Sequence, residues 1–376
     1  LVDGKTGCGK TFFMFFVAIE LAGIGVHGSV IDIKGNEWSK IMKFIKGSIE
    51  IKMTGKNARF VNTLRLDNIQ CDKDNCEELY DNAVQGTIDI FTIIVKLQEN
   101  EGNIADLVTV LETAINKLYS QHDVVRDNPE TFARTRDFKY SDVIDIVIDL
   151  KTTKSFSEAQ RRICGLIQTR SAPFFVSEGR YADAMKNELT VSEIIESPFV
   201  IYNMNKNNAE TLSTLDDLKI YMSQFLDGEK HFLRKQQKLH TAAFYEELQR
   251  CGSLSTLVRS ISARVTGSRS NNLSVFLLLN AITTLDSDAF RAIKSNITTK
   301  MIGYVEEPDQ NKLVEEYGCD DIKSYMERIR TNEKGYYNNC FAVSFNTGLK
   351  KDKVLLKSVV PKEMIEAFNT RDSFDI

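Results

Sequence analysis

The chain has 376 residues, of which 42% are hydrophobic and 27% charged, and its formal net charge is −4. This composition is typical of a globular protein, and the length predicts two to three domain-sized units. The slightly acidic balance excludes a broadly basic surface that coats nucleic acid, but it does not exclude a few basic loops that hold DNA locally.

Membrane and secretion signals are not apparent in the sequence. Its most apolar stretch, residues 12–26, is interrupted by Glu20 and is shorter than the roughly 20 residues that cross a bilayer. No signal-peptide pattern is present. The seven cysteines are scattered, which favours reduced cytosolic thiols over a disulfide framework. We therefore expect no membrane span in this chain.

The first motif, GKTGCGKT at residues 4–11, reads G-x-x-x-x-G-K-T and lies directly before an apolar helix. Glycines let successive backbone N–H groups turn onto one anion, and the helix N-terminus adds a partial positive charge. The motif predicts a nucleoside triphosphate site, with Lys10 at the phosphates and the Thr11 hydroxyl on Mg²⁺. The residues assigned to nucleotide binding are Gly4, Lys5, Thr6, Gly7, Cys8, Gly9, Lys10 and Thr11. Because only LVD precedes the loop, we expect this sequence to be the C-terminal piece of a longer chain.

The remaining elements predict an α/β fold. Residues 29–33 form a strand pattern, and strand, loop, helix, strand is a βαβ order that implies a parallel sheet. Residues 77–189 carry long helical patterns and predict a mostly helical insertion. Short apolar runs return at 197–204, 238–247, 273–281 and 299–305, and residues 339–359 form a hairpin pattern around an NTG turn. We expect a RecA-like domain in two parts, 1–76 and 190–376, around an all-α subdomain at 77–189.

A P-loop needs an acidic partner at the end of another strand. One candidate stretch contains Asp142, Asp145 and Asp149, but their spacing of three and four places them on one face of a helix. The other is HTAAFYEEL, in which a small and apolar run ends in Glu246 and Glu247. This is the pattern of a Walker B strand, so Glu246 is predicted to hold the metal shell and Glu247 to polarise the attacking water.

Two further groups are candidates for sensing or stabilising the γ-phosphate. Asn280 ends the apolar run LSVFLLLNA, and a buried amide there must find hydrogen-bond partners. Arg264 and Arg269 lie upstream in SARVTGSRSNN, which we interpret as a Gly/Ser/Asn loop. An arginine in such a loop suits an arginine finger offered to a neighbouring subunit. The choice between the two arginines stays open.

Taken together, GKTGCGKTFF, VIDIKGNE, RFVNTLRLD, FYEE, GSRSNNLSVFLLLNA and the closing AFNTRD resemble the conjugative-transfer ATPases of type IV secretion, within the FtsK–HerA group of P-loop motors. The segment Asp-x-Lys-Gly-x-Glu, formed by Asp32, Lys34, Gly35 and Glu37, is the distinctive feature beyond the P-loop. The resemblance spans nearly the whole chain. It implies a hexameric ring with Mg-ATP between subunits, secretion-channel partners, a transferred DNA or protein substrate, and a cytoplasmic position at the inner face of the membrane.

Three departures from the family pattern stand out. Glu246 and Glu247 replace the usual Asp-Glu, Asn280 replaces a usual Gln, and Ser268 separates Gly267 from Arg269. The first two favour slow hydrolysis. Two alternatives follow: a DNA translocase or coupling protein of the same superfamily, for which the basic segment at 230–238 is the candidate contact, and a scaffold subunit that binds nucleotide without hydrolysing it.

Overall fold

The structure is a computed structural model that divides into two compact units. The first comprises Leu1–Glu50, Ser197–Thr211 and Arg234–Ile376, and the second Ile51–Glu196 and Leu212–Leu233. The predicted insertion, 77–189, falls inside the second unit, which also includes 51–76, 190–196 and 212–233. The residues described are 2–3, 9–35, 37–53, 58–68, 71–98, 100–205, 213–246, 255–268, 271–279, 293, 295–305, 307–308, 310–311, 324, 326–327, 340–346 and 351–357.

Five strands form the central sheet of the first unit, in the order β3-β4-β2-β5-β6. They are β2 (His27–Asp32), β3 (Ile49–Lys52), β4 (Phe199–Asn203), β5 (Thr241–Tyr245) and β6 (Leu273–Leu277). The ladders β2–β4, β2–β5 and β5–β6 are parallel. Strands β4 and β5 are buried along their whole length, as expected for a parallel sheet covered on both faces. The strands predicted at 29–33, 197–204, 238–247 and 273–281 are therefore confirmed.

A second ladder follows the order β1-β7-β8-β9. Its strands are β1 (Val2–Asp3), β7 (Thr299–Ile302), β8 (Cys340–Asn346) and β9 (Lys351–Lys357). β1 pairs with β7 in parallel, whereas β7, β8 and β9 pair antiparallel, which confirms the C-terminal hairpin. A parallel bridge between Val2 and Leu278 joins β1 to the residue after β6. The strand before the P-loop therefore lies next to β6.

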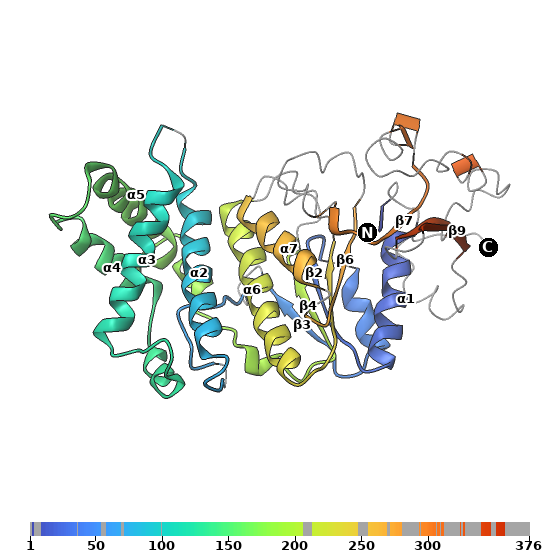
Figure 1. The fold of residues 1–376 in the computed structure, drawn as a ribbon, viewed down its shortest axis with the longest axis horizontal. Coiled ribbons are helices and arrows are strands. Elements are labelled where there is room, and N and C mark those ends of the chain that lie inside the picture. Colours follow the sequence, from blue (N-terminus) through green and yellow to red (C-terminus); the bar gives the residue numbers. More distant parts are fainter. Residues whose placement is uncertain are drawn as a thin grey trace. The chain divides into compact units, whose positions relative to one another are not determined.

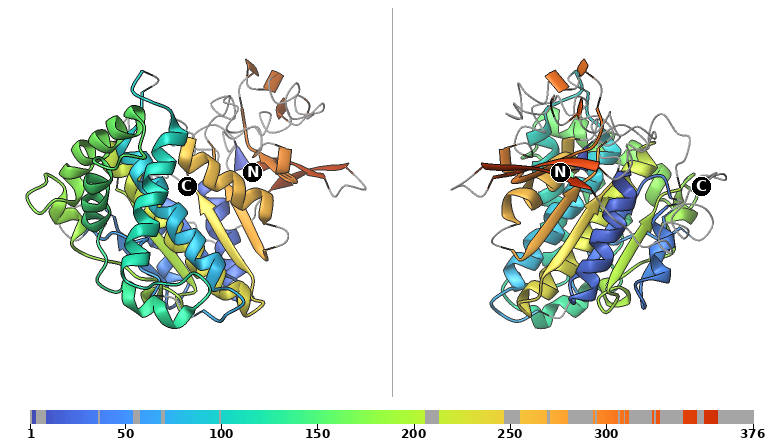
Figure 2. Two further views of the ribbon diagram at one scale, coloured as in Figure 1. Left: turned by 60° about the vertical axis from the view of Figure 1, so that its left-hand side comes forward. Right: turned by 90° about the vertical axis from the view of Figure 1, so that its right-hand side faces the viewer.

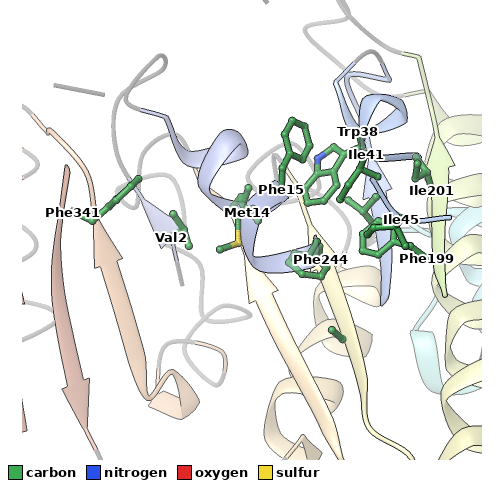
Figure 3. Packing of buried hydrophobic residues seen from close by; sticks show 14 of the residues in the cluster. Val2, Met14, Phe15, Trp38, Ile41, Ile45, Phe199, Ile201, Phe244 and Phe341 are labelled. Carbon is green, nitrogen blue, oxygen red and sulfur yellow. The ribbon is translucent and has the colours of Figure 1, made fainter. Parts of the chain in front are cut away.

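Helices α1 (Lys10–Gly23) and α7 (Ser255–Gly267) lie on opposite faces of the sheet (Figures 1 and 2). The 3₁₀ helix η1 (Trp38–Lys43) packs beside α1. On the α1 face, alternate residues of β5 enter one apolar cluster, which is drawn in Figure 3. Its members from α1, β4, β5 and η1 include Met14, Phe15, Ala18, Phe199, Ile201, Ala242, Phe244, Trp38 and Ile41. This cluster packs α1 and η1 against β4 and β5.

The second unit is mostly helical, as predicted. Its elements are α2 (Cys76–Val95), α3 (Ile104–Gln121), η2 (Pro129–Thr135), α4 (Tyr140–Leu150), α5 (Glu158–Phe175), η3 (Ala182–Met185), η4 (Val191–Glu193) and most of α6 (Thr214–Gln236). Helices α2 to α5 pack on one another. Gly86 of α2 lies so close to Phe225 of α6 that a Cβ atom would stand 2.4 Å from its ring. Among the described helices, none has the length and apolar character that crossing a bilayer requires.

Candidate active site at the carboxyl edge of the sheet

The P-loop leads into α1 through Gly9, which has φ 89° and is the N-cap of the helix. This left-handed conformation favours glycine because it lacks a Cβ. No side chain caps the helix and no acidic residue lies in its first turn, so the first N–H groups of α1 suit an anion. Lys10 begins the helix and is 7% exposed. Residues 4–8 of the loop lie outside the described residues.

The structure brings the first turn of α1 together with the end of β5. Glu246 follows β5 directly and is 3% exposed. Its Oε1 atom accepts a hydrogen bond of 2.9 Å from the Thr11 hydroxyl, across 235 residues of sequence. Its Oε2 atom accepts one of 2.9 Å from the indole Nε1 of Trp38. Both oxygens of this predicted Walker B carboxyl are therefore held by hydrogen bonds.

A second buried acid, Asp32, lies beside Glu246 and was not assigned to the site from the sequence. It ends β2 and is 0% exposed. Its Oδ1 accepts from the Gly35 backbone N–H at 2.7 Å and its Oδ2 from that of Trp38 at 3.4 Å. Because Ile31 is in register with Tyr245, the residues that follow on the two strands emerge side by side. The two carboxyls are close enough for the negative charge of Asp32 to raise the pKa of Glu246.

Gly35 makes the turn after Asp32 possible. It has φ +84°, and an added Cβ would stand 2.3 Å from Asn203 Oδ1 and 2.3 Å from the Asn205 backbone. The Asn203 side-chain amide donates to the Gly35 carbonyl at 2.7 Å. This close approach requires glycine, and it returns the chain so that Trp38 N–H and Nε1 reach the two acids.

The two carboxyls have strongly perturbed proton affinities. The pKa of Glu246 is raised to about 8. Burial is the largest cause, the negative charges of Asp32 and Glu37 act in the same direction, and Lys34 and the Thr11 hydroxyl act in the opposite direction. Burial also raises the pKa of Asp32, against the two backbone N–H groups that it accepts from. Because burial and the neighbouring negative charge both disfavour ionisation, the Glu246 carboxyl holds a proton at neutral pH.

This set of oxygen donors fits a hard divalent cation. A hydroxyl and carboxylates are the ligands that Mg²⁺ prefers, and a bound cation favours the ionised form of neighbouring acids. Thr11 and Glu246 are the pair predicted from the sequence to hold the metal. Three residues of the Asp-x-Lys-Gly-x-Glu segment, Asp32, Lys34 and Glu37, lie close enough to this carboxyl for their charges to shift its pKa.

Sequence reasoning missed Asp32 and Trp38 as site residues. The segment VIDIKGNEW was interpreted through its likeness to a family and not through its chemistry. Two signals were present: an acid ends an apolar strand pattern, and the only tryptophan of the chain follows six residues later. Neither signal shows which strand lies next to β2. The strand order decides which acid Asp32 and Trp38 contact.

The predicted arginine loop is partly wrong. Arg264 lies on helix α7 and not in a loop, because the helix continues to Gly267. Its guanidinium Nη1 donates to the Tyr245 hydroxyl at 2.7 Å. Glu247, Asn280 and Arg269 lie outside the described residues, so their roles stay predictions.

The rejected acidic candidate is helical, as predicted. Asp142, Asp145 and Asp149 all lie on α4 of the second unit. The Asp142 carboxylate accepts a 2.8 Å hydrogen bond from the Lys139 backbone N–H at the start of that helix, and Asp145 and Asp149 are exposed. Asp142 therefore stabilises the start of α4, and Asp145 and Asp149 lie on its solvent-exposed face.

No protein-family model and no curated protein matches the sequence. Solved structures do match. VirB4 of Thermoanaerobacter pseudethanolicus superposes with a TM-score of 0.68 at 13% identity, over 97% of this chain and 90% of that chain. The plasmid coupling protein TrwB in complex with the GTP analogue GDPNP gives a TM-score of 0.58 at 14% identity, over 95% and 84%. TrwB with ADP and Mg²⁺ gives 0.53 at 13% identity, over 96% and 78%.

The chain shares the fold of VirB4 and TrwB. The predicted fold class, a RecA-like P-loop fold with flanking helices, is thereby confirmed. The resemblance to conjugative-transfer ATPases holds at the level of the fold, and the match to VirB4 and TrwB extends over nearly the whole chain.

Proposed function

We propose that this chain is an ATP-hydrolysing motor of the conjugative-transfer (type IV secretion) kind, which energises substrate transfer or channel assembly. The observation that carries the proposal is the hydrogen bond between the Thr11 hydroxyl and the Glu246 carboxyl. It joins the end of the P-loop motif to the strand-end acid at a buried point, which is where a P-loop enzyme needs its metal ligands.

In this proposal, the backbone of residues 4–9 and the Lys10 side chain bind the phosphates. Thr11 and Glu246 hold the magnesium ion, which would neutralise charge on the β- and γ-phosphate oxygens. The Glu246 carboxyl must release the proton that its raised pKa favours before it can bind the metal. Lys34 provides the positive charge that favours ionised Glu246.

The catalytic residues beyond the described part are assigned by their motifs. Glu247 orients the attacking water, and Asn280 contacts the γ-phosphate. An arginine acts across a subunit boundary in a hexameric ring. Because Arg264 is bound to Tyr245 of its own subunit, we assign this role to Arg269.

Likeness to VirB4 supports a secretion motor, and the TrwB complexes with nucleotide analogues and with ADP and Mg²⁺ support the assignment of ATP and Mg²⁺ as cofactors. The partners would be secretion-channel proteins and a transferred DNA or protein, at the cytoplasmic face of the inner membrane. A DNA-coupling role is the second candidate, favoured by the likeness to TrwB. The TM-score of 0.68 to VirB4 against 0.58 to TrwB favours the secretion motor.

The test is nucleotide binding and single-turnover phosphate release by the purified protein, for wild type, Lys10→Ala and Lys46→Ala. Lys46 is an exposed lysine beyond η1 and is the matched control. We expect Lys10→Ala to lose binding and turnover and Lys46→Ala to keep both. Tight binding by the wild type without phosphate release would favour the scaffold role. Strong stimulation by DNA, with a steep salt dependence, would favour the coupling role. Unchanged activity in Lys10→Ala would refute the site.

A further inference from the structure

Trp38 contacts both buried acids of the site through two different atoms. Its backbone N–H donates to Asp32 Oδ2 at 3.4 Å, and its indole Nε1–H donates to Glu246 Oε2 at 2.9 Å. The residue is 0% exposed and is the only tryptophan of the chain. A fully buried indole N–H aimed at a carboxyl oxygen is a specific contact, because burial without a partner would destabilise the fold.

Aromatic neighbours from three elements fix the direction of the indole. Phe15 of α1 meets the ring edge-on with centroids 4.8 Å apart, and Phe199 of β4 stacks on it at 5.9 Å with an interplanar angle of 8°. Phe244 of β5 lies 5.5 Å away. Figure 3 shows Trp38 among these three side chains. The donor therefore stands on a rigid framework and not on a mobile loop.

The need for a second donor follows from the length of Glu246. Glutamate has one more methylene than aspartate, so its carboxyl has more positions to occupy and loses more rotamer freedom when fixed. Thr11 holds Oε1, but a single hydrogen bond leaves the other oxygen free to swing. A donor on Oε2 fixes the plane of the carboxyl, and hydrogen bonds to ligating carboxylates tune metal sites in this way.

We propose that Trp38 is a positioning residue that holds Glu246 in the orientation that serves the Thr11 hydroxyl and its magnesium ion. The proposal rests on the proposed function, in that Glu246 acts on a metal–nucleotide complex. Trp38 and Glu246 then form a matched pair. An aspartate at 246 would withdraw the carboxyl by about 1.5 Å, the length of one C–C bond, and could not reach both donors.

The contact itself is tested without nucleotide. With ¹⁵N-labelled tryptophan the chain gives a single indole N–H resonance, whose proton shift reports hydrogen bonding to a carboxyl. We expect this resonance to move upfield in Glu246→Ala and Glu246→Asp. Glu20→Ala, an exposed acid on α1, should leave it unchanged. An indole shift that is the same in wild type and Glu246→Ala would overturn the contact, whatever the nucleotide chemistry of the protein.

The positioning role is tested by the Mg²⁺ dependence of binding of a non-hydrolysable ATP analogue. Trp38→Phe keeps a ring but removes the donor, and we expect the apparent Mg²⁺ affinity of the analogue complex to fall about 10-fold or more. Phe15→Leu perturbs the same aromatic cluster but keeps the N–H, and should stay within about 2-fold of wild type. Equal losses in both variants, or no loss in Trp38→Phe, would overturn the positioning role.

The two measurements separate this proposal from the proposed function. If the wild type binds no analogue with or without Mg²⁺, the proposed function fails and the positioning role fails with it, while the indole resonance still decides whether the contact exists. If Trp38→Phe does not fold, Glu246→Asp takes its place. This variant leaves the aromatic cluster intact and should show the same loss of Mg²⁺ affinity. A Mg²⁺ affinity equal to that of the wild type would overturn the pairing of Trp38 with Glu246.

Discussion

Raising the pH should destabilise the magnesium-free protein through Glu246. The pKa of this carboxyl is raised from 4.5 to about 8 in the folded state, with burial as the main cause. Between these two values the folded protein keeps a proton that the unfolded chain releases. The stabilisation is fully present below the unfolded pKa and is lost as the pH rises through the folded pKa.

The size of the effect follows from linkage. While only the folded state holds the proton, the free energy of unfolding falls by about 1.4 kcal/mol for each pH unit. From pH 5 to pH 7 this amounts to roughly 2–3 kcal/mol. Glu229 has a pKa raised in the same direction, to about 8, by burial. A matched variant is therefore needed to isolate Glu246, and Glu246→Gln removes the titrating group at similar volume.

The assay is urea unfolding in EDTA at several pH values from 5 to 8, for wild type and Glu246→Gln. We expect a steeper loss of stability in the wild type, because the variant has no proton to release at position 246. Adding Mg²⁺ and a non-hydrolysable ATP analogue should flatten the wild-type curve, because a bound cation favours the ionised acid. Parallel curves for the two proteins would refute the buried, protonated Glu246 carboxyl.

Two further predictions concern the groups around the site. Gly35→Ala should destabilise the protein by roughly 1–3 kcal/mol more than Gly47→Ala in urea unfolding. Both glycines have positive φ, but only at Gly35 would the new Cβ overlap neighbouring atoms, and equal losses would contradict the crowded turn. Tyr245→Phe should lower stability by about 1–3 kcal/mol, because it leaves the Arg264 guanidinium without this acceptor. This loss should largely disappear in an Arg264→Ala background. If the stability losses of the two substitutions add fully, the Arg264–Tyr245 hydrogen bond would be contradicted.

Local patterns in the sequence were sufficient for most of the fold. The strands of the central sheet are short apolar runs between helical segments, and the P-loop glycines directly precede a mostly apolar helix. The Thr11–Glu246 pairing could be predicted because a P-loop needs an acid at a strand end, and HTAAFYEEL offers one. Such patterns depend on residues close in sequence, which is why they could be identified.

Features that depend on strand order could not be predicted. Asp32 meets Glu246 only because β2 and β5 are neighbours with Ile31 opposite Tyr245, and that pairing joins distant segments. The same holds for Trp38, whose partner lies 208 residues away. Arg264 was assigned to a loop because a Gly/Ser/Asn cluster follows closely, but α7 continues to Gly267, a common residue at helix ends.

The most direct measurement on the Thr11–Glu246 site is the coupling between Mg²⁺ and nucleotide. Binding of a non-hydrolysable ATP analogue would be measured by calorimetry with Mg²⁺ and with EDTA, for wild type and Thr11→Val, which has the same shape without the hydroxyl. We expect Mg²⁺ to strengthen binding to the wild type about 10-fold or more, and to have little effect in the variant. An equal Mg²⁺ effect in both proteins would contradict the assignment of this hydroxyl and carboxyl to the metal.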